Sequence, residues 1–117
     1  DIGFAKEELE SFSATTFFLE EADLFPLHRR FHRFAHKGDF GKILLIAGSK
    51  GKMGAAILAS KAAFRTGSGL VTCLIPEEER SALAAAVPEA MCVIGDQQEF
   101  SAYDAIGIGP GLGMDQG

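Results

Sequence analysis

Two glycine-rich segments are the parts of this sequence whose residue types and spacing could bind a ligand. The first reads Gly-Ser-Lys-Gly-Lys-Met-Gly over residues 48–54, and the second reads Gly-Pro-Gly-Leu-Gly over residues 109–113. Glycine lets the backbone approach a ligand closely, and backbone N–H groups beside a helix N-terminus bind anions without any charged side chain. The two segments therefore predict a site for a phosphate, a pyrophosphate or a ribosyl group.

The spacing of the first segment departs from the common nucleotide-binding templates. It is G-x-x-G-x-x-G rather than the G-x-G-x-x-G of dinucleotide-binding folds. It is not a P-loop, because Met53 follows Gly51 and Lys52 where that motif requires Ser or Thr. A tight turn whose glycines only let a strand and a helix pack closely is the alternative to ligand binding.

The elements that must position these segments alternate between strands and helices. An apolar strand at 43–47 leads into the first segment, and a strand at 103–108 leads into the second. Between them the pattern predicts further strands at 70–75 and 91–94 and helices at 55–66 and 77–87. Such an alternation predicts an α/β fold with a parallel sheet, in which ligands bind beyond the carboxyl ends of the strands.

Composition and charge exclude several classes of protein. The chain has 117 residues, of which 47% are hydrophobic and 23% charged, so it is not broadly disordered. A net charge of -5 argues against nucleic-acid binding, although residues 28–42 are basic after an acidic segment at 1–27. No apolar run approaches the roughly 20 residues of a membrane span, and no signal peptide is present, so a cytoplasmic location is expected.

Cysteine and histidine spacing predicts no metal site. Cys73 and Cys92 lie in apolar runs without paired zinc-ligand spacing, so we expect buried, reduced thiols. His28 and His32 are four residues apart and could share a helix face, but no third ligand is placed to complete a site. For His36 the sequence leaves two interpretations open, a role in the ligand site or a structural role in its turn.

Five short motifs follow one another in the second part of the chain. They occupy residues 36–42, 47–49, 53–56, 65–72 and 107–113. In this order and with this spacing, the motifs resemble those of the ADP/ATP-dependent NAD(P)H-hydrate dehydratase family. Each motif alone is weak, but five in order make the resemblance specific, and it covers roughly residues 36–113.

The resemblance implies a partial ribokinase-like three-layer fold, truncated at its C-terminal side. It implies that the full-length protein is a lyase that repairs hydrated NADH or NADPH. In that family ADP or ATP, with Mg²⁺, phosphorylates the hydrate's hydroxyl, and phosphate is then eliminated. By motif position, Ala55 and Gly111 correspond to residues that contact the hydrated dinucleotide, and Gly54 and Gly109 are their backbone neighbours.

Several segments of the family do not occur in this chain. They are the Gly-Thr-Gly-Asp segment that carries the catalytic acid, the His-Pro-Gly-Glu segment and the Lys-Gly nucleotide loop. We therefore expect no catalytic residue here, place those segments downstream of Gly117, and predict that the chain alone is inactive. Residues 1–35 are expected to be a linker or the tail of a preceding epimerase-like domain, and 36–117 the N-terminal part of the dehydratase domain.

Three other interpretations remain open from the residues. A Rossmann-type dinucleotide-binding module would need an acidic residue near the end of the second strand, where Glu77, Glu78 and Glu79 lie. A ribokinase-like small-molecule kinase fragment would share the fold class. A fragment with an interaction or structural role would leave a strand edge and an apolar helix face uncovered. It would form a homo-oligomer or associate with the missing half of the domain.

Overall fold

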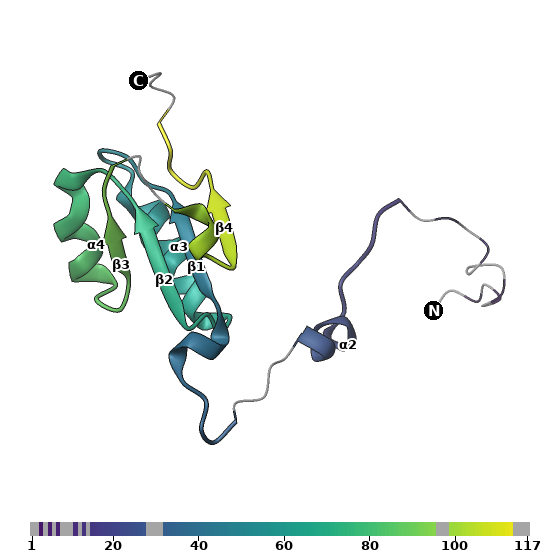
Figure 1. Ribbon diagram of the computed structural model, residues 1–117. Coiled ribbons are helices and arrows are strands. Elements are labelled where there is room, and N and C mark those ends of the chain that lie inside the picture. The colour runs from purple at the N-terminus through teal and green to yellow at the C-terminus, as the bar shows by residue number, and fades with distance from the viewer. Residues whose placement is uncertain are drawn as a thin grey trace. The chain divides into compact units, whose positions relative to one another are not determined.

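Residues 3, 5, 7, 11, 13, 15–27, 32–95 and 99–113 are described by a computed structural model of the chain (Figure 1). The chain divides into two units, Asp1–Arg30 and Phe31–Gly117. In the first unit, the sequence of residues 20–27 predicts a turn or two of helix stopped by Pro26, and the structure forms α2 (Glu21–Leu24) and the 3-10 helix η1 (Phe25–Leu27) there. The α-helix ends at Leu24 with Phe25 as its C-cap, directly before Pro26, which lies inside η1.

Two further predictions concern the first unit. The sequence of residues 6–12 suggests a short helix, but this segment falls mostly outside the described residues. Residues 15–19 suggest a short extended piece, and the structure forms no strand there. Helix α2 is held locally, because the Glu20 backbone N–H donates to Asp23 Oδ2 at 2.9 Å.

A four-stranded parallel sheet organises the second unit (Figure 1). Its strands are β1 (Lys42–Ile46), β2 (Leu70–Leu74), β3 (Met91–Val93) and β4 (Ala105–Ile108), in the spatial order β3-β2-β1-β4. The predicted α/β class and parallel sheet are therefore confirmed. Strand β1, the most apolar run of the sequence, is central and pairs with both β2 and β4.

Helices α3 (Met53–Arg65) and α4 (Arg80–Ala86) pack on one face of the sheet, and the 3-10 helix η3 (Glu77–Glu79) leads into α4. Strand side chains that point toward this face, such as Val71 and Cys73 of β2, form the core together with helix side chains such as Leu83 of α4. All three residues are 0% exposed. Helix α3 is rich in alanine, which lets it approach the strands closely. It ends as expected, with Gly67 at φ 100° after the last turn.

The opposite face of the sheet is apolar and only partly covered. Register places Leu44, Thr72, Met91 and Ile106 in one row on this face. The two inner residues are buried, whereas Met91 is 46% and Ile106 42% exposed. The described part of the chain therefore supplies the sheet and one helical layer, which is a partial form of the three-layer fold.

The motif at residues 36–42 lies at the amino ends of the strands. It forms the 3-10 helix η2 (Lys37–Phe40), and the Gly69 N–H donates to the Phe40 carbonyl at 3.2 Å. A side chain at Gly69 would collide with the Lys37 carbonyl oxygen. Asp104 joins the same end to β4, because its Oδ2 accepts from the Lys42 N–H at 2.7 Å.

His36 makes its described contacts within the turn that it precedes. Its backbone N–H donates to Asp39 Oδ2 at 2.9 Å, and its Nε2 lies 3.4 Å from Asp39 Oδ1. These contacts are at the end of the sheet opposite to the glycine segments. Of the two roles left open by the sequence, the structure supports the one in the turn.

Some predicted boundaries were wrong by one to three residues. Helix α3 begins at Met53 and not at residue 55, so Gly54 lies in the first helical turn and not in a loop. Strand β4 begins at Ala105, because Tyr103 ends the 3-10 helix η4 (Phe100–Ala102). Among the described residues, no helix has the length and apolar character needed to cross a lipid bilayer.

Burial predicts that two leucines of the helical layer differ in their contribution to stability. Leu83 is 0% exposed and Leu58 is 70% exposed. Leu83→Ala should lower the free energy of unfolding by about 2–5 kcal/mol because it leaves a cavity. Leu58→Ala should change it by less than about 0.5 kcal/mol, and urea unfolding of both variants measures the difference. Equal losses in the two variants would contradict this arrangement of the core.

Candidate functional site

The two glycine segments lie side by side at the carboxyl ends of β1 and β4. These parallel strands end in register, with Ile46 opposite Ile108. The Gly48 N–H donates to the Pro110 carbonyl at 2.8 Å, and Ser49 Oγ donates to the Gly111 carbonyl at 2.8 Å. Segments far apart in the sequence thus form one surface at the end of the sheet where ligands of parallel α/β proteins bind.

Gly111 packs directly on the first turn of α3. A Cβ atom at this position would lie 2.8 Å from Ala55 Cβ and 2.8 Å from the Lys52 carbonyl oxygen. The backbone of Gly111 has φ 71°, a conformation that L residues rarely adopt. The structure therefore brings together two of the predicted site residues, Ala55 and Gly111.

The other two predicted site residues, Gly54 and Gly109, lie on the open side of the same end of the sheet. Both are exposed, and a Cβ atom at either would have no neighbouring atom within 4 Å. Gly54 presents the backbone of the first turn of α3, and Gly109, at φ 128°, begins the turn after β4. Their exposed backbone is the surface on which a ligand can rest.

The local charges favour an anion at this end of the sheet. No side chain caps the N-terminus of α3 in the described structure; the Ala55 N–H donates to the Lys52 carbonyl at 3.2 Å, and the first N–H groups of a helix in general have no i−4 acceptor. The helix dipole adds partial positive charge there, and Lys50 and Lys52 are exposed in the same segment. The site is thus suited to a phosphate or pyrophosphate.

One acidic side chain also reaches the first glycine segment. Glu79 Oε1 accepts a hydrogen bond from the Gly51 N–H at 3.3 Å. From the sequence alone, the position of Glu79 after the second strand was relevant only to the Rossmann-type interpretation, which needs an acidic residue there. The contact itself could not be predicted, because it depends on how η3 lies beside the segment.

The site holds no cluster of metal ligands within the described residues. Cys73 is remote from it, on the helix-facing side of β2, where its Sγ lies 3.0 Å from Ser60 Oγ. Burial raises the pKa of the Cys73 thiol, so this thiol is protonated at neutral pH. Both cysteines are free; Cys73 is buried as expected, whereas Cys92 is only half-buried.

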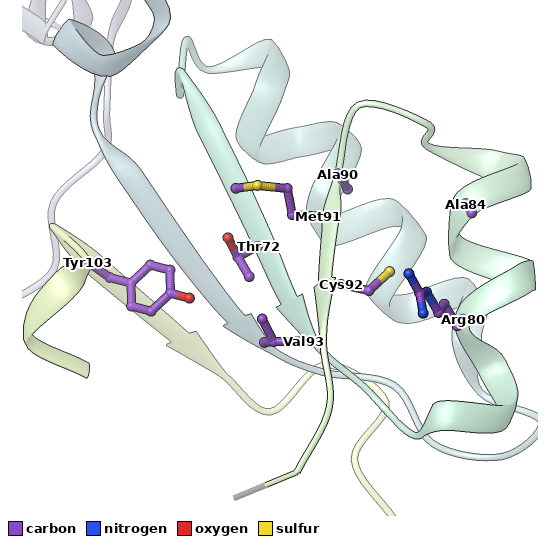
Figure 2. A pocket seen from close by; sticks show the side chains of 8 residues that line it. All are labelled: Thr72, Arg80, Ala84, Ala90, Met91, Cys92, Val93 and Tyr103. Atoms are coloured by element: carbon purple, nitrogen blue, oxygen red, sulfur yellow. The ribbon is translucent and has the colours of Figure 1, made fainter. Parts of the chain in front are cut away.

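A separate open pocket of about 550 Å³ lies around the edge strand β3 (Figure 2). Arg80 and Cys92 line it on the α4 side, and Tyr103 lies on the other side of the strand with Thr72. No residue of either glycine segment contributes to its lining. The pocket has neither the backbone N–H groups nor the helix N-terminus of the glycine surface, so we place the candidate site at the glycine segments.

This parallel sheet, with helices on one face and glycine segments at the carboxyl ends of its strands, defines an α/β protein of the class that binds ligands at that edge. A family model for NAD(P)H-hydrate dehydratase matches residues 43–117. The chain belongs to the NAD(P)H-hydrate dehydratase family.

Curated relatives agree with this assignment. The chain is 46% identical over 86 residues to the ADP-dependent (S)-NAD(P)H-hydrate dehydratase of Staphylococcus aureus, and this match covers 69% of the chain and 31% of that protein. It is 41% identical over 85 residues to the enzyme of the same name from Listeria monocytogenes, with 68% and 31% covered. The chain thus spans about a third of the length of these relatives.

Solved structures show the same fold. The ADP/ATP-dependent NAD(P)H-hydrate dehydratase of Bacillus subtilis, co-crystallized with ATP/Mg²⁺, matches with a TM-score of 0.75 and 32% identity, covering 86% of this chain and 38% of that one. A ribokinase-like superfamily protein of Enterococcus faecalis matches with a TM-score of 0.65 and 33% identity, covering 74% and 32%. The predicted ribokinase-like class is confirmed, as a partial fold.

Two glycines of the site should respond differently to the same substitution. Gly111→Ala should lower the free energy of unfolding by about 2 kcal/mol or more, because the methyl group meets Ala55 and the backbone is left-handed. Gly54→Ala should leave stability unchanged or raise it by up to about 1 kcal/mol, because it lies in a helix with open space around it. Urea unfolding of the two variants measures this, and equal effects would show that Gly111 does not pack on α3.

The two thiols should differ in reactivity. Under native conditions a maleimide should modify Cys92 and leave Cys73 unmodified, because Cys73 is 0% exposed and protonated. Both should react in denaturant. Mass spectrometry of the native and denatured chain reports the sites, with Cys92→Ser as the control that leaves only Cys73. Rapid native labelling of that variant would contradict the burial of Cys73.

Proposed function

We propose that the full-length protein carrying this chain is an ADP- or ATP-dependent NAD(P)H-hydrate dehydratase. The observation that carries the proposal is the pairing of the two glycine segments beside the N-terminus of α3, in a chain of this family. The names of the relatives support it, because both curated enzymes are called ADP-dependent (S)-NAD(P)H-hydrate dehydratases. The B. subtilis structure, obtained with ATP/Mg²⁺, supports the use of a nucleotide.

The reaction needs a change of leaving group. The hydrated nicotinamide ring carries a hydroxyl, which leaves poorly. Transfer of a phosphoryl group from ADP or ATP converts it into a phosphate ester, and loss of phosphate with a ring proton restores the double bond of NADH or NADPH. Both steps depend on holding the dinucleotide in a fixed position relative to the phosphoryl donor.

In this proposal the described chain binds the hydrated dinucleotide. Ala55 and Gly111 form the close-packed floor, and Gly54 and Gly109 offer exposed backbone to the ligand. The described residues contain no ligand set for Mg²⁺, and the sequence lacks the Gly-Thr-Gly-Asp segment. The proposal assigns the catalytic acid and most of the nucleotide site to the part of the relatives' length that this chain does not span.

The proposal extends to the N-terminal segment and to partners. We assign residues 1–35 to the linker or tail of an epimerase-like domain. The 35% identity to the bifunctional NAD(P)H-hydrate repair enzyme Nnr of Coxiella burnetii supports this, because that match covers 96% of the chain and 24% of that enzyme. Exposed Ile106 and Ile108 support association with a second copy or with the rest of the domain. The free cysteines fit a cytoplasmic location.

A Rossmann-type dinucleotide-binding module is the second candidate function. The contact of Glu79 with the first glycine segment favours it, since such modules use an acid after the second strand to bind ribose. The two candidates differ in chemistry, because a binding module has no reason to convert the hydrate. They also differ in preference between intact NAD and the hydrated cofactor.

The proposal predicts nucleotide-dependent turnover by the full-length protein and none by the 117-residue chain. Incubation with NADH hydrate, Mg²⁺ and ADP or ATP should yield NADH, seen by its absorbance, with one phosphate released for each NADH formed. Omission of the nucleotide should abolish conversion. A full-length protein that binds intact NAD and converts no hydrate would contradict the dehydratase proposal. Turnover by the short chain would contradict the assignment of catalysis to other segments.

A further inference from the structure

Cys73 and Cys92 form a pair of thiols on neighbouring strands, away from the glycine segments. Strands β2 and β3 run parallel, and their register sets Cys73 directly opposite Cys92. Both side chains face the helical layer, since Cys73 belongs to the buried core and Cys92 packs against it. Both thiols are free. The fold thus places two oxidisable groups side by side on one face of the sheet.

The spacing of this pair suits a disulfide bond. Neighbouring strands lie about 4.8 Å apart, within the roughly 4.4–6.8 Å between Cα atoms that a disulfide spans. Burial raises the pKa of the Cys73 thiol most, a hydrogen bond with Ser60 lowers it, and the nearby Cys92 raises it further. The two sulfurs are therefore close enough to interact. Rotation of the two side chains brings them together without moving the strands.

Ser60 lets Cys73 turn towards its partner at little cost. The Ser60 Oγ donates to the Ala56 carbonyl at 2.7 Å and lies 3.0 Å from the Cys73 Sγ. Because a hydroxyl has one hydrogen, the Cys73 thiol is the donor in the second contact. When Cys73 turns away, the buried Ser60 hydroxyl keeps its bond to Ala56, so no buried donor is left without an acceptor.

Access from solvent differs between the two thiols. Cys92 is half-buried and lines the open pocket around β3 (Figure 2). Cys73 is 0% exposed and does not contribute to the lining of that pocket. Oxidation of a thiol depends on its exposure, so a small oxidant meets Cys92 first. Cys73 is then placed to react with the oxidised Cys92 rather than with the oxidant itself.

We propose that Cys92 and Cys73 form an oxidation site, at which hydrogen peroxide converts the two thiols into a disulfide between β3 and β2. In the first step the Cys92 sulfur attacks the peroxide: an S–O bond forms and the O–O bond breaks. The departing oxygen leaves as water with the thiol proton, and Cys92 becomes a sulfenic acid. This inference is independent of the proposed function.

The second step joins the two strands. The Cys73 sulfur attacks the sulfur of the sulfenic acid at Cys92, so an S–S bond forms and the S–O bond breaks. The hydroxyl group leaves with the thiol proton of Cys73 as a second water. In total two thiols are oxidised, and one peroxide is reduced to two water molecules.

Peptide mapping of the full-length protein that carries this chain tests the site. The native protein is treated with hydrogen peroxide, its remaining thiols are blocked with a maleimide, and it is then denatured and digested with trypsin. Cleavage after Arg65 and Arg80 puts Cys73 in the peptide 66–80 and Cys92 in the peptide that begins at Ser81. We expect these peptides to be joined, with the loss of two hydrogens, and to separate again in dithiothreitol.

Two variants distinguish the roles of the thiols. In Cys73→Ala the sulfenic acid at Cys92 has no partner thiol, so dimedone should label Cys92 and the joined peptides should be lost. In Cys92→Ser the buried Cys73 should stay reduced over the same time, because peroxide does not reach it. The result in the unmodified protein stands by itself if the buried substitution impairs folding.

Joined peptides in the unmodified protein, lost in both variants, support the proposal. A Cys92 oxidised to sulfinic acid beside a reduced Cys73 would overturn it, because the buried thiol then fails to reach its partner. A disulfide that joins two copies through Cys92, or a Cys92 that peroxide leaves reduced, would overturn it as well. None of these outcomes bears on conversion of the hydrate, so failure here leaves the proposed function in place.

Discussion

The parallel pairing of β1 with β4 is the constraint on which the site depends. The two strands come from opposite ends of the second unit, and their register ends with Ile46 beside Ile108. That register places the two glycine segments next to each other, 62 residues apart along the chain at the Ser49 to Gly111 hydrogen bond. Without the pairing, each segment would be an ordinary turn after a strand.

Close packing at this end of the sheet depends on the absence of side chains. Gly111 lies so near Ala55 and Lys52 that a methyl group would separate the second segment from α3. Gly69 has the same function at the amino end, where it packs against the turn of residues 37–40. The family motifs therefore have two places in the fold: one group closes the amino end of the sheet, and the other forms the surface that we propose binds the ligand.

Much of the fold could be predicted because its signals are local. The apolar run of β1, the alanine-rich α3 with Gly67 after it, and the glycine segments all specify their conformations from neighbouring residues. In the second unit the errors fell at boundaries, where tertiary contacts decide. Gly54 joined α3, and Tyr103 was left outside β4, because hydrogen bonds of the surrounding turns ended or extended those elements.

The sequence by itself determined the alternation of strands and helices, the parallel sheet, the family and the candidate residues Gly54, Ala55, Gly109 and Gly111. Only the tertiary structure decided that Ala55 and Gly111 touch, that the motif containing His36 lies at the opposite end, and that Glu79 reaches Gly51. The reason is physical. Backbone propensity and apolar periodicity act over a few residues, whereas these contacts join segments whose distance is set by strand order and register.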